Sequence, residues 1–116
     1  MRLLIFVLNQ SEKLDAVLNA FQNAGIGGAT ILDSTGMAKV LHTADEEEEM
    51  PLFGSLRHFL NPSREKSHTI FTVLQDSQLQ TAVDAIESVV GDLKQANAGI
   101  VFSLPIDYVK GLRGIE

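Results

Sequence analysis

The same order of segments occurs near both ends of this chain, with a long stretch between the two copies. In each copy a short run rich in apolar and β-branched residues precedes a stretch with apolar side chains three or four residues apart, and a second short run follows. The six segments, in chain order, cover residues 3–8, 14–21, 29–32, 67–74, 79–93 and 100–104. The short runs are typical of strands, and the three-or-four spacing is typical of amphipathic helices. The sequence therefore predicts two β-α-β units.

Residues that begin and end helices and strands support this division. Ser11 is a predicted N-cap of the first helix, and Asp76 or Ser77 of the second. Gly25 follows the first helix at the position where a left-handed residue commonly ends one. The second helix has the most regular pattern, with apolar positions at Leu79, Ala82, Val83, Ile86, Val89, Val90 and Leu93.

Two β-α-β units in 116 residues predict one α+β domain, residues 1–116, with a ferredoxin-like βαββαβ fold. In this arrangement four strands form one antiparallel sheet, and both helices lie on one face of it. The length and the mass of 12.6 kDa fit a single domain of this kind.

The stretch between the two units, residues 37–66, is much longer than an ordinary connection and is the predicted long loop between strands two and three. Residues 37–41 are a candidate extension of the second strand. Residues 45–49 are five consecutive acids, which must be solvated. Residues 51–60 begin with a proline and carry apolar side chains on one helical face, which predicts a short helix. That face either packs on its own domain or meets another subunit or partner.

Charge and composition exclude several classes of protein. The formal net charge is −6, and the acids of residues 45–49 supply five of the fifteen Asp and Glu residues. Nucleic acids and anionic membrane surfaces attract basic proteins, so neither is an expected partner. The chain has no cysteine, which excludes disulfides and thiolate metal ligands. The apolar run at residues 3–8 is too short for a signal peptide or a membrane span, so we expect a cytoplasmic protein.

No catalytic motif is present, and we expect a protein that is not an enzyme. Residues 25–28, Gly-Ile-Gly-Gly, follow a helix and precede a strand, the reverse of a dinucleotide-binding loop, and we interpret them as a turn. Two alternatives stay open. One is a divalent-metal-handling protein with ligands from His42 and residues 45–49, and the other is a small ferredoxin-like enzyme with His42 or His58 as its base.

Three basic residues suggest an anionic ligand. Lys39 lies at the start of the long loop, and Lys110 and Arg113 lie after the last strand. Cations from a loop and from a chain end could meet around an anion in a cleft between subunits. Simple solubility is the alternative explanation.

Two stretches carry a resemblance to a known family. Residues 24–39 read AGIGGATILDSTGMAK, and residues 100–110 read IVFSLPIDYVK. The first resembles a helix ending in Gly-Ile, a strand with Gly-x-Thr and a glycine-containing loop root. The second resembles a last strand with its proline and a basic segment. Together they resemble the nitrogen-regulatory P-II and P-II-like signalling family, over nearly the whole chain.

The resemblance implies a homotrimer that binds a small anionic metabolite or a nucleotide, such as an adenine nucleotide, in clefts between subunits and acts on a target protein through the loop 37–66. Carried over by position, the implied ligand-binding residues are Thr30, Gly36, Met37, Ala38, Lys39, Asn97, Gly99 and Lys110. Residues 92–99 stand where the family has its phosphate loop but are poorer in glycine and lack its final lysine. Leu112 stands where the family has a second basic residue, and the adjacent Arg113 is the candidate for that ligand-binding role.

Overall fold

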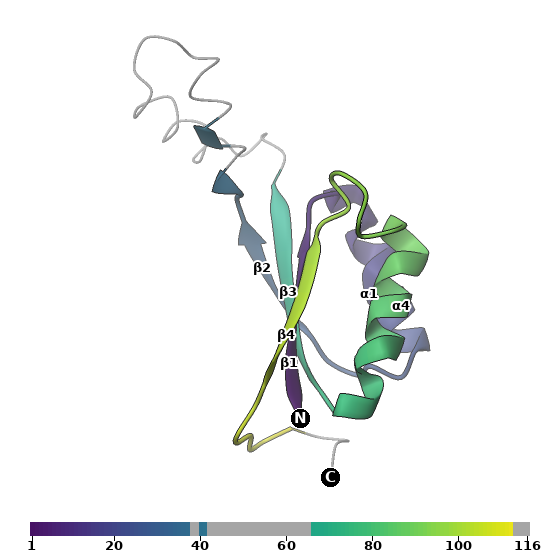
Figure 1. The fold of residues 1–116 in the computed structure, drawn as a ribbon, viewed down its shortest axis with the longest axis vertical. Helices are drawn as coiled ribbons and strands as arrows, with labels where there is room; N and C mark the ends of the chain where they lie inside the picture. Colours follow the sequence, from purple (N-terminus) through teal and green to yellow (C-terminus); the bar gives the residue numbers. More distant parts are fainter. Residues whose placement is uncertain (38–39, 42–65, 113–116) are drawn as a thin grey trace.

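The computed structural model describes residues 1–37, 40–41 and 66–112, and all statements below concern these residues (Figure 1). They form four strands, two α-helices and two short 3-10 turns. In chain order these are β1 (Arg2–Leu8), η1 (Ser11–Lys13), α1 (Leu14–Asn23), β2 (Thr30–Ser34), β3 (Ser67–Leu74), η2 (Asp76–Gln78), α4 (Leu79–Val90) and β4 (Ile100–Pro105). The predicted βαββαβ order is confirmed.

The strands form one sheet in the order β2-β3-β1-β4, with antiparallel neighbours throughout. Both helices pack on the same face of this sheet (Figure 1). The α+β, ferredoxin-like prediction is therefore confirmed. Each β-α-β unit has a strand of the other unit inserted between its own two strands, and this interleaving is what joins the two halves into one sheet.

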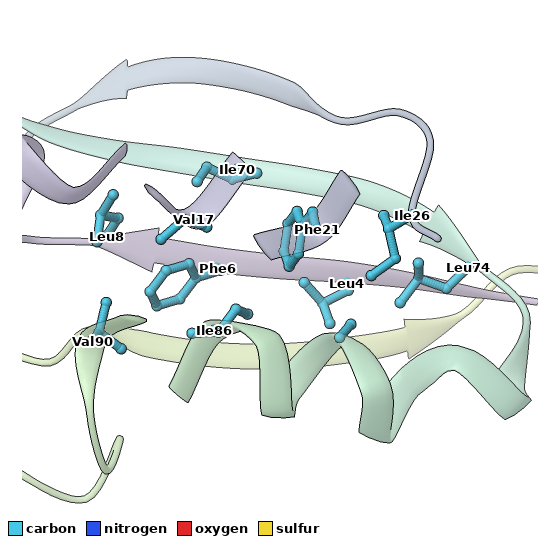
Figure 2. Packing of buried hydrophobic residues seen from close by; sticks show 11 residues of the cluster. Leu4, Phe6, Leu8, Val17, Phe21, Ile26, Ile70, Leu74, Ile86 and Val90 are labelled. Atoms are coloured by element: carbon cyan, nitrogen blue, oxygen red, sulfur yellow. The ribbon is translucent and has the colours of Figure 1, made fainter. Parts of the chain in front are cut away.

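Alternation along the two central strands builds the core between sheet and helices (Figure 2). Every second residue of β1 points toward the helices, and Phe6 and Ile70 lie opposite each other on β1 and β3. Because side chains of a strand alternate between the faces, these positions are buried while their neighbours are not. The fully or nearly fully buried apolar residues of this cluster are Leu4, Phe6, Leu8, Val17, Phe21, Ile26, Ile70, Leu74, Ala82, Ile86 and Val90.

The start of each helix differs from the prediction. Ser11 lies in the turn η1, and its hydroxyl donates a hydrogen bond to the Lys66 carbonyl rather than capping α1. Asp76 and Ser77 lie within η2, where the backbone N–H of Gln75 is held by the Gln78 side-chain oxygen at 3.0 Å. Both helices thus begin with a 3-10 turn. The prediction for the end of the first helix was right, since Gly25, two residues after the last residue of α1, has φ +83°.

The second strand is shifted relative to its prediction. It covers Thr30–Ser34 rather than residues 29–32, because Asp33 and Ser34 also pair with β3. The predicted strand extension at residues 37–41 is wrong for the described part. Met37, Val40 and Leu41 are helical, and the Val40 N–H donates to the Gly36 carbonyl at 3.2 Å. The acidic run 45–49 and the predicted helix 51–60 lie outside the described residues.

The sheet face away from the helices is apolar and carries no other described element (Figure 1). Strand register places nine apolar side chains on it, and we call this surface the open face: Leu3, Ile5, Val7, Leu32, Phe71, Val73, Ile100, Phe102 and Leu104. Its outer members are well exposed, with Ile100 at 59% and Phe102 at 43%. An apolar sheet face of this extent is unusual on a monomeric protein and typical of an interface.

Candidate functional site

A pocket of about 520 Å³ lies where the α1–β2 connection meets the last residues of β3. Its wall combines a glycine-rich loop, one strand and the end of the described chain. The lining residues are Gly25, Ile26, Gly27, Gly28, Ala29, Thr30, Phe71, Thr72, Val73, Leu74, Gln78 and Leu112. Ile26 and Leu74 belong to both the core and this pocket, and Figure 2 shows them near each other at one end of the core.

The loop at residues 25–29 is fixed at both ends. On one side Gly25 turns the chain with φ +83°, and the Ile26 N–H donates to the Phe21 carbonyl at 2.9 Å. On the other side the Thr72 hydroxyl donates to the Gly28 carbonyl. A Cβ atom added to Gly27 or Gly28 would have no other atom within 4 Å. The bare backbone of these two glycines therefore borders open space beside the pocket.

The pocket is uncharged. None of its lining residues is acidic or basic, and its polar side chains are Thr30, Thr72 and Gln78. Two of these three side chains already form hydrogen bonds. The Thr72 hydroxyl donates to the Gly28 carbonyl, and the Gln78 side-chain oxygen accepts from the Gln75 N–H. Within the described residues the backbone N–H groups of Gly27 and Gly28 have no hydrogen-bond partner. The pocket thus combines apolar walls with the bare backbone of Gly27 and Gly28.

The end of the described chain supplies the last wall. After β4, the Ile106 N–H donates to the Met1 carbonyl at 3.0 Å, which ties residues 106–112 to the start of β1. Gly111 then adopts φ +92°, a conformation that favours glycine. The next residue, half-buried Leu112, lines the pocket.

Comparison with known families identifies the chain. The family model described as nitrogen regulatory protein P-II matches residues 1–116. The chain belongs to the P-II family. The resemblance predicted from residues 24–39 and 100–110 is therefore confirmed, and the protein is a signal-transduction regulator rather than a member of an enzyme family. A comparison with individual curated proteins gave no match.

The P-II residues expected to bind ligand are not brought together by a single chain. Thr30 lines the pocket, and Lys110 lies two residues before Leu112. Gly36 follows the opposite end of β2, and Gly99 precedes β4. Because β2 and β4 run in opposite directions at the two edges of the sheet, these residues lie at separate places on one chain.

Five other expected ligand-binding positions are less informative. Met37 is helical and 77% exposed. Ala38, Lys39 and Arg113 lie outside the described residues. Asn97 has φ +66° in the turn before β4, and its carbonyl accepts a hydrogen bond from Gln10 Nε2 at 3.3 Å.

In the loop at residues 91–99 of this P-II chain, two backbone N–H groups already donate hydrogen bonds to carboxylates. Glu87 accepts a hydrogen bond from the Leu93 N–H at 3.0 Å, and Asp92 accepts one from the Lys94 N–H at 2.9 Å. Backbone N–H groups that could receive a phosphate are thus occupied by the chain's own anions. Gly99 has a packing role, since a Cβ atom there would lie 2.3 Å from the Val7 carbonyl oxygen.

The described residues give no support to a metal or catalytic site. They contain no group of three or more side chains suited to hold a metal ion. His68 pairs with Asp33 across β2 and β3, with 3.4 Å between Nδ1 and Oδ1, and it does not line the pocket. His42, His58 and the acidic run lie outside the described residues. None of the helices that the structure describes is long and apolar enough to cross a membrane.

Sequence reasoning missed most of the pocket wall. Residues 25–28 were interpreted as a turn, which is correct for Gly25 but incomplete for Gly27 and Gly28. A helix end needs only one left-handed glycine. The two further glycines, Gly27 and Gly28, were therefore the signal in the sequence that a backbone without side chains has a second role at this place. Nothing in the sequence signalled that Leu112 folds back on this loop.

Proposed function

We propose that this P-II protein is a trimeric regulator that binds a small anionic metabolite or a nucleotide, such as an adenine nucleotide, between subunits. Through residues 37–66 it acts on a target protein. Ligand binding is supported by the pocket between the glycine loop and β3, which has Thr30 and the bare backbone of Gly27 and Gly28 in its wall. Pockets of several hundred Å³ with few polar groups are typical of small-molecule sites.

The open face supports assembly. Its central members on β1 and β3 are only partly exposed, whereas Leu32, Ile100, Phe102 and Leu104 on the edge strands are 43–59% exposed. Burying this surface against other copies would remove it from water, with a gain of about 25 cal/mol for each Å² of apolar area. Closed cyclic symmetry would let each subunit use the same face.

The separation of the expected ligand residues supports a shared site. Thr30 and Leu112 lie at the pocket, whereas Gly36 and Gly99 lie elsewhere on the same chain. A ligand contacted by both groups requires that one subunit supply the pocket and its neighbour supply the other group. Such a site is complete only in the assembly, so that ligand binding and assembly are coupled.

The position of residues 37–66 supports a role in contacting a target. Strands β2 and β3 remain paired up to Ser34 and Ser67, and the segment leaves the sheet immediately beyond this pair. Both ends of the segment are therefore attached at the same end of the sheet. This position suits a recognition segment carried on a stable scaffold.

Calorimetric titration with ATP, ADP, AMP and adenosine tests the ligand. We expect saturable binding of at least one of them and an increase in the melting temperature. Gly28→Ala should weaken that binding at least tenfold, because its methyl group enters open space at the pocket without a clash in the free protein. Thr81→Ala, at an exposed position of α4, is the matched control and should leave binding unchanged.

Absence of both heat and a thermal shift with all four compounds would remove the adenine nucleotide from the proposal. Light scattering tests the assembly separately. We expect three times the chain mass of 12.6 kDa, and a particle of the single chain mass would refute the trimer.

A further inference from the structure

We propose that Gln10 and Ser11 are positioning residues that couple the loop at residues 91–99 to the point where the chain returns from residues 37–66 to the sheet. Both belong to residues 9–13, the connection between β1 and α1, which we call the β1–α1 turn. The inference rests on the proposed function in taking residues 37–66 as the segment that contacts a target. It concerns the route by which the rest of the domain controls that segment, and its test needs no ligand.

Strand register places the β1–α1 turn between two points where the chain enters the sheet. The last residue of β1, Leu8, pairs with His68 of β3, and Val7 pairs with Ile100 of β4. Because both pairings are antiparallel, β3 and β4 begin where β1 ends. Figure 1 shows the start of α1 and the loop after α4 at this same end of the sheet.

Two adjacent side chains of the turn bind the chain at these two points. The Gln10 side-chain amide donates to the Asn97 carbonyl, with 3.3 Å between Nε2 and the oxygen. The Ser11 hydroxyl donates to the Lys66 carbonyl. The acceptors lie 87 and 55 residues away along the chain. The turn therefore connects the main chain of the loop 91–99 with the main chain at the start of β3.

The turn between these two hydrogen bonds is held by further contacts. The Lys13 N–H donates to the Gln10 carbonyl at 2.9 Å, which closes the 3-10 turn η1. The Lys13 ammonium group donates to the Val89 carbonyl near the end of α4, at 3.5 Å. Coupling between sites is carried by hydrogen-bond networks and rigid elements of this kind. A shift of Asn97 that displaces Gln10 thus also displaces Ser11.

From Lys66 the connection continues to the end of β2. The next residue, Ser67, is 1% exposed, and its hydroxyl donates to the Ser34 carbonyl at 2.9 Å. Ser34 is the last residue of β2 and pairs with Ser67 across the two strands. The position of Ser11 therefore affects both strand ends that flank residues 37–66.

A double-mutant cycle measured by hydrogen exchange tests the coupling in the full chain without ligand. Glu87→Ala removes the acceptor of the Leu93 N–H and loosens the loop 91–99 at a point outside the β1–α1 turn. We expect amide exchange of residues 67–70 to become at least threefold faster in this variant. In a Gln10→Leu background the same change should not accelerate it further, because the link to the loop is absent.

The matched control is Ser88→Ala, one residue further along α4. Its hydroxyl donates to the Ala85 carbonyl within the helix, so that its loss should leave exchange at residues 67–70 unchanged. A merely structural role of Gln10 predicts a different result for the cycle. The Gln10→Leu change would then lower stability, but the response to Glu87→Ala would be the same in both backgrounds.

Two variants at position 11 test the second half of the route. Ser11→Ala removes the hydroxyl that binds Lys66 and should abolish the response of residues 67–70 to Glu87→Ala. Ser11→Thr keeps a hydroxyl and should preserve the response. Melting temperatures show whether each variant is folded, and the Gln10→Leu cycle remains decisive if Ser11→Ala is not.

Unchanged exchange of residues 67–70 in Glu87→Ala would overturn the inference. An equal acceleration in the wild-type and Gln10→Leu backgrounds would overturn it as well, as would a response that persists in folded Ser11→Ala. The proposed function fails separately. If adenine nucleotides do not bind but the cycle shows coupling, the nucleotide is the wrong ligand and the inference holds. If they bind but the effects in the cycle are additive, the route through Gln10 and Ser11 is wrong.

Discussion

The Thr72 hydroxyl of β3 donates a hydrogen bond to the Gly28 carbonyl, and this contact joins the loop after α1 to the central part of the sheet. Thr72 is only 4% exposed, although it is a polar residue within the helix-facing row of β3. Its hydroxyl thus donates to one acceptor, the Gly28 carbonyl, and the same hydrogen bond fixes one wall of the pocket.

Replacing Thr72 with valine keeps the shape of the side chain and removes the donor. We expect Thr72→Val to lower the free energy of unfolding by about 1–2 kcal/mol, the usual cost of a lost hydrogen bond with one partner left behind. Urea denaturation at a fixed protein concentration measures this change. Thr81→Val on the exposed side of α4 is the control, and an equal loss in both variants would contradict a specific role for the contact.

Most of the fold follows from the sequence because alternation and helical spacing are local properties. Residues 67–74 were predicted as a strand and form β3 with the same bounds. The ends of elements depend on contacts far along the chain, and these were predicted less well. Ser11 has the composition of an N-cap, but its hydroxyl binds the carbonyl of Lys66, 55 residues away. Ser34 lies beyond the predicted end of the second strand at residue 32, but pairing with Ser67 keeps it in β2.

Gly99 packs against β1 more tightly than any other residue type would allow. It has φ +108°, and a Cβ atom would lie 2.3 Å from the Val7 carbonyl oxygen and 2.8 Å from Cε1 of Phe6. Gly91 has φ +85° but no atom within 4 Å of such a Cβ. The losses of stability in Gly91→Ala and Gly99→Ala therefore distinguish the cost of backbone strain from the cost of steric overlap.

We expect Gly91→Ala to lower the free energy of unfolding by about 1–3 kcal/mol, because φ +85° with ψ −169° is a backbone region that residues with a Cβ atom rarely adopt. Gly99→Ala should cost about 1–3 kcal/mol more, because the methyl group also displaces buried neighbours. Thermal and urea denaturation of both variants measure the difference. Equal losses would show that β1 moves away from the added methyl group without cost.

The candidate site could be predicted only in part, for a physical reason. Thr30 was identified through the family resemblance and does line the pocket. Phe71 and Val73 follow an ordinary strand pattern, and their place beside the glycine loop depends on strand order, which no local pattern contains. Leu112 depends on a chain reversal after β4. The pocket wall is thus a product of tertiary packing.

Three hydroxyl groups form a polar cluster where β2 ends and β3 begins, on the same side of the sheet as the open face. Ser34 Oγ lies 2.9 Å from Ser67 Oγ and accepts a hydrogen bond from Thr69 Oγ1 at 2.9 Å. Ser67 is 1% exposed. The cluster secures the last pairs of β2 and β3 before the chain enters residues 37–66.

Ser34→Ala removes the central hydroxyl of this cluster and deprives Thr69 of its acceptor. We expect a loss of about 1–3 kcal/mol in the free energy of unfolding. Hydrogen exchange should also be faster at the β2–β3 pairs near Ser34, because the end of this ladder frays more readily. The control is Ser88→Ala on α4, whose hydroxyl binds only the Ala85 carbonyl one turn back. Exchange unchanged in Ser34→Ala would contradict a securing role for the cluster.

Phe102 tests whether the open face is the assembly surface. It lies on the edge strand β4, 43% exposed, directly opposite Ile5 in the centre of that face. In Phe102→Glu a carboxylate replaces the ring. The isolated chain tolerates this change because the position contacts water, whereas burial between subunits would leave the charge without a partner.

We expect the mass of Phe102→Glu measured by light scattering to fall from three times the chain mass to the single chain mass, with a circular dichroism spectrum that is still that of a folded chain. Thr81→Glu, on the helical side of the sheet, adds the same charge and should leave the mass unchanged. If Phe102→Glu keeps the assembled mass, subunits meet through a surface other than the open face.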